Sequence, residues 1–304
     1  NSQAEVLFGK VVASNVIDGK ALGAELENSL KIRVSNIKKV HRPPHLVVII
    51  VGDDPASKVY VRNKERACKR IGIDSTRVDL PSTCSHEDLE NLIGEFNEDP
   101  GVDGILVQSP LPTGFDEIGI TELIDPRKDV DGFHPINLGR IVTGRLGGLL
   151  PCTPSAVMKI LESTGVEMKG KRALVVGRSR IVGMPTALLM AQKGIDATVT
   201  VCHSKSEDLE GLCKSSDIIV AAAGKAGMIH HQWVPIGSII IDVGINRVEE
   251  DGRSRLVGDV EGAASTRASW ITPVPGGVGP MTIAMLMSNT VTAAESIFNR
   301  SEDS

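Results

Sequence analysis

Short apolar runs alternate with helical stretches along this 304-residue chain, and this alternation constrains its fold more than any other feature. Residues 46–51 read Leu-Val-Val-Ile-Ile-Val, and residues 104–107 read Gly-Ile-Leu-Val. Runs of this length, rich in β-branched residues, are typical of strands buried on both faces. The spacing of apolar residues predicts helices around these strands, over residues 20–40, 56–70 and 85–97.

The same alternation restarts after residue 171 and predicts strands over residues 173–176, 197–201, 217–221 and 239–243, with helices between the first three. Elements of this length imply right-handed crossovers and a mostly parallel sheet. The last helix, over residues 281–298, follows the completed sheet, and we expect it to pack back on the first half of the chain. Residues 125–154 are rich in Gly, Pro and Asp and are predicted to be an irregular linker with site loops.

The length and composition suit a globular α/β protein of two domains. A chain of 304 residues is typical of two domains of about 150 residues each. No apolar run approaches the roughly 20 residues that a membrane span needs, so no membrane partner is expected. The net charge of −5 and the absence of any Lys or Arg run argue against nucleic acid as a partner.

Cysteine usage indicates a reducing compartment. The five cysteines are odd in number and form no CxxC pair, so we expect free thiols and no metal site. The chain begins at Asn1 and not at Met, which leaves room for an upstream targeting peptide. Both the cytoplasm and the mitochondrial matrix fit these observations.

Residues 171–183 predict a strand, a glycine-bearing turn and the start of a helix. A helix N-terminus presents N–H groups and a partial positive charge, which suits a pyrophosphate, and Gly177 and Gly183 permit a close turn. Ser179 stands where the G-x-G-x-x-G fingerprint has its second glycine, so a plain turn between strand and helix stays an equal alternative.

The end of the second strand of this half favours NADP over NAD. Residues 200–205 contain hydroxyl groups, a histidine and a lysine, but no carboxylate to bind a ribose 2′-hydroxyl. Arg178 lies in the preceding turn, and an arginine together with the Ser204 hydroxyl suits a 2′-phosphate. The alternative for Arg178 is an ordinary solvated turn residue.

Tyr60 and Lys64 are four residues apart and share one face of a predicted helix. The ring of Tyr60 could stack on a flat heterocycle, and Lys64 could reach the reacting edge of that heterocycle. For an isolated pair of this kind, a half-buried aromatic ring beside a surface amine is the commoner situation.

Three loop positions are further candidates. Gln108 follows a buried strand, where its amide can orient an amine or bond to the strand-end backbone. Asp131 lies in a loop beside a glycine, where a carboxylate can bind an aminopyrimidine edge or cap the loop. The glycine-rich residues 276–279 can bring backbone close to a flat ring or form the turn before a helix that begins near Pro280.

Five segments of the chain carry a family resemblance: residues 60–64, 102–112, 128–134, 177–179 and 272–282. In sequence, order and spread, from about residue 17 to 298, the chain closely resembles the bifunctional methylene-tetrahydrofolate dehydrogenase/cyclohydrolase family. The resemblance implies two αβα domains flanking a cleft, the second a Rossmann-like parallel-sheet NADP domain through which the protein forms a homodimer. One departure is Ser109, where many members have Leu.

The resemblance also implies an activity and a division of the chain. The expected reactions are the NADP-dependent oxidation of 5,10-methylene-tetrahydrofolate and hydrolysis of the methenyl product to 10-formyl-tetrahydrofolate, with a polyglutamylated folate as substrate. Residues 1–153 would form the folate-binding and catalytic domain, residues 154–280 the NADP domain, and residues 281–304 a helix packed on the first domain.

The roles of individual residues follow from the same resemblance. Tyr60 matches the pterin-stacking tyrosine and Lys64 the catalytic lysine, which we expect Gln108 to support; Asp129 is expected to be structural. The implied substrate-binding residues are Tyr60, Asp131, Pro275, Gly276 and Gly279. The implied cofactor-binding residues are Gly177, Arg178, Ser179, Ser204, Ile245, Gly276, Gly277 and Val278.

Two functions from other classes stay open at this point. One is an amino-acid or shikimate-type dehydrogenase, which shares the two-domain layout but should lack the segment at residues 128–134. The other is a non-catalytic folate or nucleotide sensor on the same fold, since a fold alone does not give a function.

Overall fold

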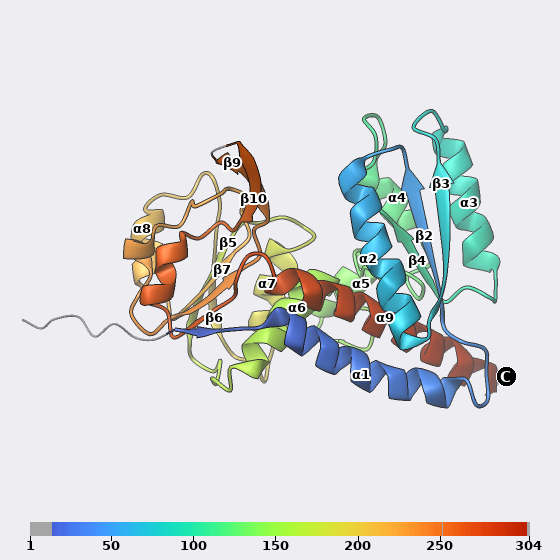
Figure 1. Ribbon diagram of the computed structural model, residues 1–304. Coiled ribbons are helices and arrows are strands. Elements are labelled where there is room, and N and C mark those ends of the chain that lie inside the picture. The colour runs from blue at the N-terminus through green and yellow to red at the C-terminus, as the bar shows by residue number, and fades with distance from the viewer. Residues whose placement is uncertain (1–13, 251, 303–304) are drawn as a thin grey trace, which may run out of the picture.

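Two lobes, each built on a parallel sheet, make up the molecule (Figure 1). The structure is a computed structural model that describes residues 14–250 and 252–302. The smaller sheet has the strand order β3 (Asp74–Leu80), β2 (His45–Val51), β4 (Gly104–Val107). The larger sheet has the order β1 (Asn15–Val16), β11 (Trp270–Ile271), β8 (Ile239–Asp242), β7 (Ile218–Ala221), β5 (Arg172–Val176), β6 (Thr198–Cys202). All pairs in both sheets are parallel, which confirms the predicted α/β class.

The smaller lobe contains the predicted strands and helices together with one strand and one helix that were not predicted. Its elements are β2 (His45–Val51), α2 (Pro55–Ile71), β3 (Asp74–Leu80), α3 (His86–Glu98), β4 (Gly104–Val107) and α4 (Glu117–Leu123). The Asp54 carboxylate accepts a hydrogen bond of 2.7 Å from the Ser57 N–H and so caps α2, as N-terminal aspartates commonly do. Strand β3 was not predicted, because it is an edge strand whose residues are largely polar and lack an apolar run.

The larger lobe contains all four strands predicted for it. The elements in chain order are α6 (Cys152–Ser163), β5 (Arg172–Val176), α7 (Gly183–Met190), β6 (Thr198–Cys202), α8 (Leu209–Lys214), β7 (Ile218–Ala221) and β8 (Ile239–Asp242). Two 3-10 turns and an antiparallel hairpin complete it: η1 (His231–Trp233), η2 (Gly262–Thr266), β9 (Asn246–Glu250) and β10 (Arg253–Val257).

The prediction that residues 125–154 are irregular was partly wrong, because they contain α5 (Pro135–Val142) and the start of α6. Helix α5 begins with a proline in its first turn, and the His134 ring accepts a hydrogen bond of 3.1 Å from the Ile136 N–H. Eight residues are too few for the apolar spacing to stand out from the surrounding turn residues.

A short segment near the N-terminus departs from the predicted division of the chain. Strand β1 (Asn15–Val16) pairs with β11 (Trp270–Ile271), so it lies in the larger sheet and not in the lobe expected for residues 1–153. Strands of two residues are formed by backbone hydrogen bonds and leave no periodic pattern in the sequence. Functional boundaries at 153 and 280 stay a prediction.

Helices α1 (Gly19–Ile37) and α9 (Val278–Glu302) run side by side beneath the smaller lobe (Figure 1). A Cβ atom on Gly19 would lie 1.8 Å from the carbonyl oxygen of Gly277, so glycine is required where α1 meets the turn before α9. Helix α9 packs against α1, α2, β2 and β4, and against α6 of the larger lobe. The prediction that the last helix packs back on the first half of the chain is confirmed.

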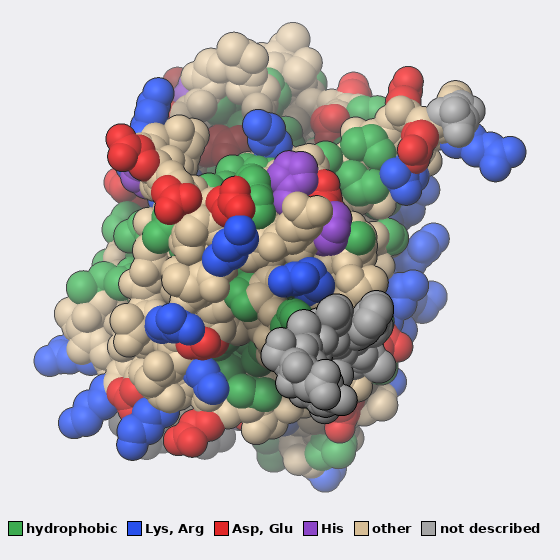
Figure 2. All heavy atoms as spheres, turned by 90° about the vertical axis from the view of Figure 1, so that its left-hand side faces the viewer, with side chains coloured by type: hydrophobic (Ala, Val, Ile, Leu, Met, Phe, Trp, Pro, Cys, Tyr) green, Lys and Arg blue, Asp and Glu red, His purple; other side chains and the backbone are tan. Residues whose placement is uncertain are grey.

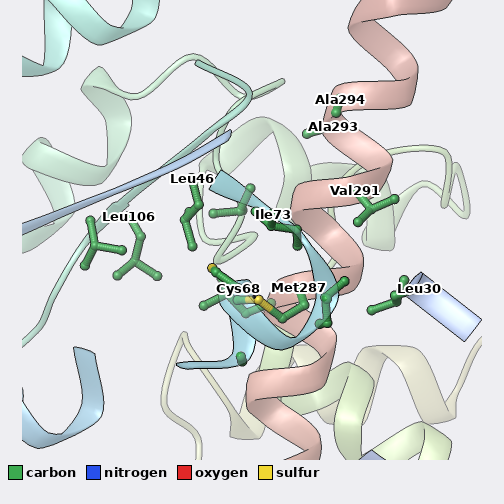
Figure 3. Close-up of a cluster of buried hydrophobic side chains, with 14 of the residues drawn as sticks. Leu30, Leu46, Cys68, Ile73, Leu106, Met287, Val291, Ala293 and Ala294 are labelled. Carbon is green, nitrogen blue, oxygen red and sulfur yellow. Dashed lines mark hydrogen bonds between the residues drawn. The ribbon is translucent and has the colours of Figure 1, made fainter. Parts of the chain in front are cut away.

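The core of the smaller lobe closes around α9 (Figure 3). Leu46 and Leu106 come from the small sheet, and Cys68 of α2 lies with its Sγ 3.5 Å from the Sδ of Met287. Burial of each large apolar side chain stabilises the fold by about 1.5–3 kcal/mol. Burial also raises the pKa of the Cys68 thiol to about 12, and all five cysteines are free, as predicted.

Helix hydropathy and the charge on one face of the molecule can be described for the parts that the structure covers. Among the described residues, no helix is both long and apolar enough to cross a bilayer. On the face of the larger lobe drawn in Figure 2, Lys and Arg side chains are interspersed with Asp and Glu. This face therefore carries no extended patch of one sign.

Candidate active site

Lys64 and Gln108 meet at the carboxyl-terminal edge of the small sheet. Gln108 directly follows β4, and its backbone N–H donates to the carbonyl of Ile49 in β2, at 2.9 Å. The Nζ of Lys64, on α2, donates to the Oε1 of Gln108 at 2.9 Å. The Nε2 of Gln108 donates to the Ser109 carbonyl at 2.6 Å, which fixes the amide so that its oxygen faces the lysine. Gln108 therefore holds the lysine amine by a hydrogen bond, and its role in a reaction stays a prediction.

Asp131 carries a half-buried carboxylate close to this pair. Burial raises its pKa to about 6, against the opposing effect of the Lys64 charge and with a smaller upward contribution from Asp129. No side-chain hydrogen bond to this carboxylate occurs among the described residues. Because a buried carboxylate is stable only when its oxygens find donors, Asp131 is ready to accept hydrogen bonds from a ligand.

Tyr60 lies one helical turn before Lys64 on α2, and 47% of it is exposed. An exposed aromatic ring beside an amine and two polar side chains offers a flat apolar face to a ring-shaped ligand. Three of the predicted site residues on the folate side, Lys64, Gln108 and Asp131, are thus near one another, and Tyr60 adjoins them along the helix.

Two buried charged side chains hold the loop that carries Asp131. Asp129 accepts hydrogen bonds from the N–H groups of Gly132 and His134 and from the Nδ2 of Asn137, at 3.2, 2.8 and 3.0 Å. Lys128 donates from Nζ to three backbone carbonyls at the end of α3, and burial lowers its pKa. These contacts are consistent with the structural role expected for Asp129. The role of Lys128 was missed, because nothing in the local sequence marks it.

The turn after β5 requires glycine at its first position and is held by the side chain of Ser179. Gly177 has φ +121°, and a Cβ atom there would lie 2.2 Å from the Ala222 carbonyl oxygen, so only glycine fits. The Ser179 hydroxyl accepts hydrogen bonds from the N–H groups of Val182 and Gly183, at 3.1 and 3.2 Å. Two of the N–H groups at the start of α7 are therefore already capped by Ser179, which also explains why serine stands at this position.

Arg178 and Ser204 are neighbours across two adjacent strand ends. Val176 pairs with Cys202 in the sheet, and each of the two candidate residues lies two positions beyond one member of this pair. Both side chains are exposed, and the structure shows no hydrogen bond or ion pair from either to another described residue. A guanidinium and a hydroxyl without internal partners can both donate hydrogen bonds to a phosphate group.

The glycine-rich turn before α9 serves partly to pack the chain against itself. A Cβ atom on Gly277 would lie 2.6 Å from the Pro273 carbonyl oxygen, and the Val278 side chain is buried in the core of the larger lobe. Gly279 lies beside Ile245, whose Cδ1 is 3.9 Å from where a Cβ of Gly279 would be. Ile245 is 47% exposed, so it stays accessible to a ligand, as do Pro275 and Gly276 in the same turn.

A cavity of about 750 Å³ lies away from these residues, between the hairpin β9–β10 and the β1 edge of the larger sheet. Val16, Arg255 and Leu256 are among its lining residues. Its lining includes residues 272–274, next to the predicted site residue Pro275, but neither Lys64 nor Gln108.

Two buried carboxylates in the larger lobe, those of Asp259 and Asp242, were not predicted from the sequence to have a role. Asp259 accepts hydrogen bonds from three consecutive N–H groups, those of residues 223, 224 and 225, at 2.7–2.8 Å. Asp242 accepts from the N–H groups of Gly244, Asp259 and Val260, and burial raises its pKa to about 6. These aspartates shape the loops after β7 and β8. Their partners are up to 36 residues away, so no local motif announces them.

Sequence comparison matches both lobes to one family. Residues 17–131 match the family described as tetrahydrofolate dehydrogenase/cyclohydrolase, catalytic domain. Residues 151–298 match tetrahydrofolate dehydrogenase/cyclohydrolase, NAD(P)-binding domain. Both halves thus belong to the same two-domain enzyme family, which argues against the shikimate-type alternative.

Individual relatives agree along nearly the whole chain. The bifunctional protein FolD of Acetivibrio thermocellus is 50% identical over 284 residues, which cover 93% of this chain and 97% of the relative. The crystal structure of the bifunctional methylenetetrahydrofolate dehydrogenase/cyclohydrolase FolD from Campylobacter jejuni is 45% identical with a TM-score of 0.90, covering 93% of this chain and 99% of that one.

A further solved relative contains a bound nucleotide. The FolD structure from Trypanosoma brucei, in complex with NADP cofactor and an inhibitor, is 39% identical with a TM-score of 0.88 and covers 96% of this chain and 99% of that one. The agreement in sequence, length and fold with these proteins leads to one assignment. The chain belongs to the tetrahydrofolate dehydrogenase/cyclohydrolase family.

Proposed function

We propose that this protein is a bifunctional enzyme of one-carbon metabolism that oxidises 5,10-methylene-tetrahydrofolate and hydrolyses the 5,10-methenyl product to 10-formyl-tetrahydrofolate. The observation that carries the proposal is the Lys64–Gln108 hydrogen bond beside the unpaired Asp131 carboxylate, in a chain of this family. The test is to add methylene-tetrahydrofolate and nicotinamide nucleotide and follow the reduced nicotinamide band. Hydrolysis is followed separately as loss of methenyl absorbance. A protein that binds folate but shows neither reaction is a sensor and defeats the proposal.

The folate side holds and orients the substrate. The Asp131 carboxylate accepts hydrogen bonds from the aminopyrimidine edge of the pterin. No described side chain donates a hydrogen bond to this carboxylate, so its oxygens are available to the substrate. The ring of Tyr60 stacks on the pterin face, and Lys64 then lies at the edge where the one-carbon bridge sits. Positioning of this kind supplies a large part of the rate enhancement in bimolecular reactions.

Oxidation needs little from the side chains beyond positioning. When bound, NADP supplies the hydride acceptor. The methylene carbon is already activated by its two nitrogen neighbours, so no side-chain acid is required for hydride loss. The turn at residues 275–279 and the accessible side chain of Ile245 would hold the nicotinamide when it is bound.

Hydrolysis requires a proton to move. Water adds to the methenyl carbon and loses a first proton as the C–O bond forms. One C–N bond then breaks as the C=O bond forms: the hydroxyl loses its remaining proton to solvent, and the departing nitrogen takes up the first proton. Lys64, oriented by Gln108, is the group that accepts and returns this proton.

Cofactor preference follows from Arg178 and Ser204. A 2′-phosphate placed between the two strand ends would receive hydrogen bonds from a guanidinium and a hydroxyl, and residues 200–205 present no carboxylate to repel it. NADP is therefore the preferred cofactor.

Replacement of Arg178 by Ala tests this preference. We expect NADP to lose about 1.5–3 kcal/mol of binding free energy, the range for a charge-assisted hydrogen bond, while the kinetics with NAD hardly change. The measurement is kcat/KM for each nucleotide in the parent and in the Arg178→Ala variant. Equal kinetics with both nucleotides in the parent protein would show that the preference does not exist.

Assembly into a homodimer is the next expectation. The larger sheet ends in two edge strands, β1 and β6, and parallel edges that are not covered invite an isologous partner. Light scattering at micromolar concentration is expected to give twice the chain mass. A monomer mass under these conditions contradicts the proposal.

Lys64→Met separates the two activities. Methionine keeps most of the volume and the stem of the side chain but removes the amine. We expect cyclohydrolase activity to fall about 10²-fold or more, because an acid–base group is lost, while dehydrogenase activity stays measurable. Lys69→Met, at an exposed position on the same helix, is the matched control and is expected to leave both rates unchanged. If the Lys64→Met variant hydrolyses the methenyl compound at the parental rate, Lys64 has no catalytic role.

The pH dependence of folate use reports on Asp131. Its pKa is raised to about 6, so the carboxylate takes up a proton and loses acceptor capacity as the pH falls through 6. We expect kcat/KM for methylene-tetrahydrofolate to fall about tenfold per pH unit below that value. Asp131→Asn keeps one acceptor oxygen but has nothing to titrate, so its lower kcat/KM is expected to lose this inflection. A flat parental profile between pH 5 and 7 would rule out an ionised Asp131 as the folate ligand.

A further inference from the structure

Asn289 is a buried amide near the middle of α9 that plays no part in the reactions described above. Its Nδ2 donates to two backbone carbonyls, those of Val130 and Leu150, each at 2.8 Å. The same nitrogen lies 3.5 Å from the Sγ of Cys152. Both hydrogens of the amide are therefore used, and they tie together two loop segments that are far apart in the sequence.

The carbonyls that Asn289 binds flank the backbone of Asp131. Val130 precedes Asp131, and the Cys152 N–H donates to the Asp131 carbonyl at 3.3 Å. The Cys152 thiol donates to the Val130 carbonyl at 3.2 Å. Gly132 is pressed against the second segment, since a Cβ atom there would lie 2.4 Å from the carbonyl carbon of Leu150. Asn289 thus joins the backbone on either side of Asp131 to the segment at residues 150–152.

Helix α9 connects these two segments to the glycine-rich turn at residues 276–277. It begins at Val278, directly after Gly276 and Gly277, and Asn289 lies about three turns further on. Met287 and Val291, two residues before and after Asn289, are fully buried and fix this part of the helix in the core (Figure 3). One rigid element therefore carries both the glycine turn and the amide that holds the Asp131 loop.

We propose that Asn289 is a positioning residue, which sets the place of the Asp131 carboxylate relative to α9 and so the distance between folate and nicotinamide. The inference rests on the proposed folate-binding function of Asp131. Asparagine suits the position because its NH₂ group satisfies two carbonyls at once. An aspartate there would direct a negative charge at two carbonyl oxygens, and a leucine would leave both of them without this donor.

Asn289→Leu tests the inference, because leucine keeps the side-chain volume and removes the donor. We expect kcat/KM for folate to fall about tenfold or more in both reactions, since small displacements of a bound reactant are costly. The KM for NADP is expected to stay within about twofold, because the turn after β5 is untouched. Thr290→Val is the matched control: it removes a buried hydroxyl on the same helix whose hydrogen bond goes only to Leu286 of that helix.

A double-variant cycle distinguishes positioning from a general loss of stability. If Asn289 acts through Asp131, adding Asn289→Leu to Asp131→Asn lowers kcat/KM for folate by less than about twofold further. Losses that multiply, or a rise in the NADP KM equal to that in the folate KM, would overturn the inference. Asn289→Ser retains one hydroxyl donor and is expected to fall between the parent and Asn289→Leu. It carries the same comparison if the leucine variant does not fold.

The proposed function and the proposed role of Asn289 can be disproved separately. A parent protein without either activity defeats the proposed function. A parent with both activities, together with an Asn289→Leu variant whose folate kinetics are parental, defeats only the role of Asn289.

Discussion

The burial of α9 against both lobes is the interaction on which the rest of the structure depends. The helix contacts α1, α2 and two strands of the smaller lobe, and α6 of the larger lobe. Met287 and Val291 are completely buried, and the apolar side chains of Figure 3 close around them. Because hydrophobic burial is not directional, it supplies stability but not the exact placement of the site. That placement comes from polar contacts made along the same helix.

Buried polar groups fix the positions of the loops at the carboxyl ends of the strands. In parallel sheets these ends lie at one edge, so Gln108 after β4 and Gly177 after β5 each begin a site loop. Asp129 and Asp259 would be costly to bury alone, but each accepts three or more hydrogen bonds, chiefly from backbone N–H groups, and so fixes the loop around it. The loops are irregular in sequence and yet well defined in space.

The proposed site residues differ from these scaffold residues because they have donors or acceptors that make no hydrogen bond within the described protein. The Asp131 carboxylate and the side chains of Arg178 and Ser204 have no hydrogen-bond partners among the described residues, whereas the scaffold carboxylates are saturated. A carboxylate held half-buried without an internal partner, as at Asp131, is costly to the fold and is typical of a binding site. Asn289 resembles the scaffold residues because the hydrogens of its amide are all used within the protein. It also influences the site, because it holds the backbone that presents Asp131.

The sequence by itself determined the elements whose residues are buried in a regular pattern. Apolar runs and helical spacing identified β2 and β4 of the smaller lobe and β5 to β8 of the larger lobe, and the motifs around Lys64, Gln108 and Asp131 indicated the family. Short or edge elements such as β1, β3 and α5 escaped, because they bury too little apolar surface to leave a period. Only the tertiary structure decided that Lys64 bonds to Gln108, and that Asn289 bonds to a carbonyl 159 residues away. Hydrogen bonds to backbone carbonyls depend on where the chain returns in space, and any residue type can supply the carbonyl.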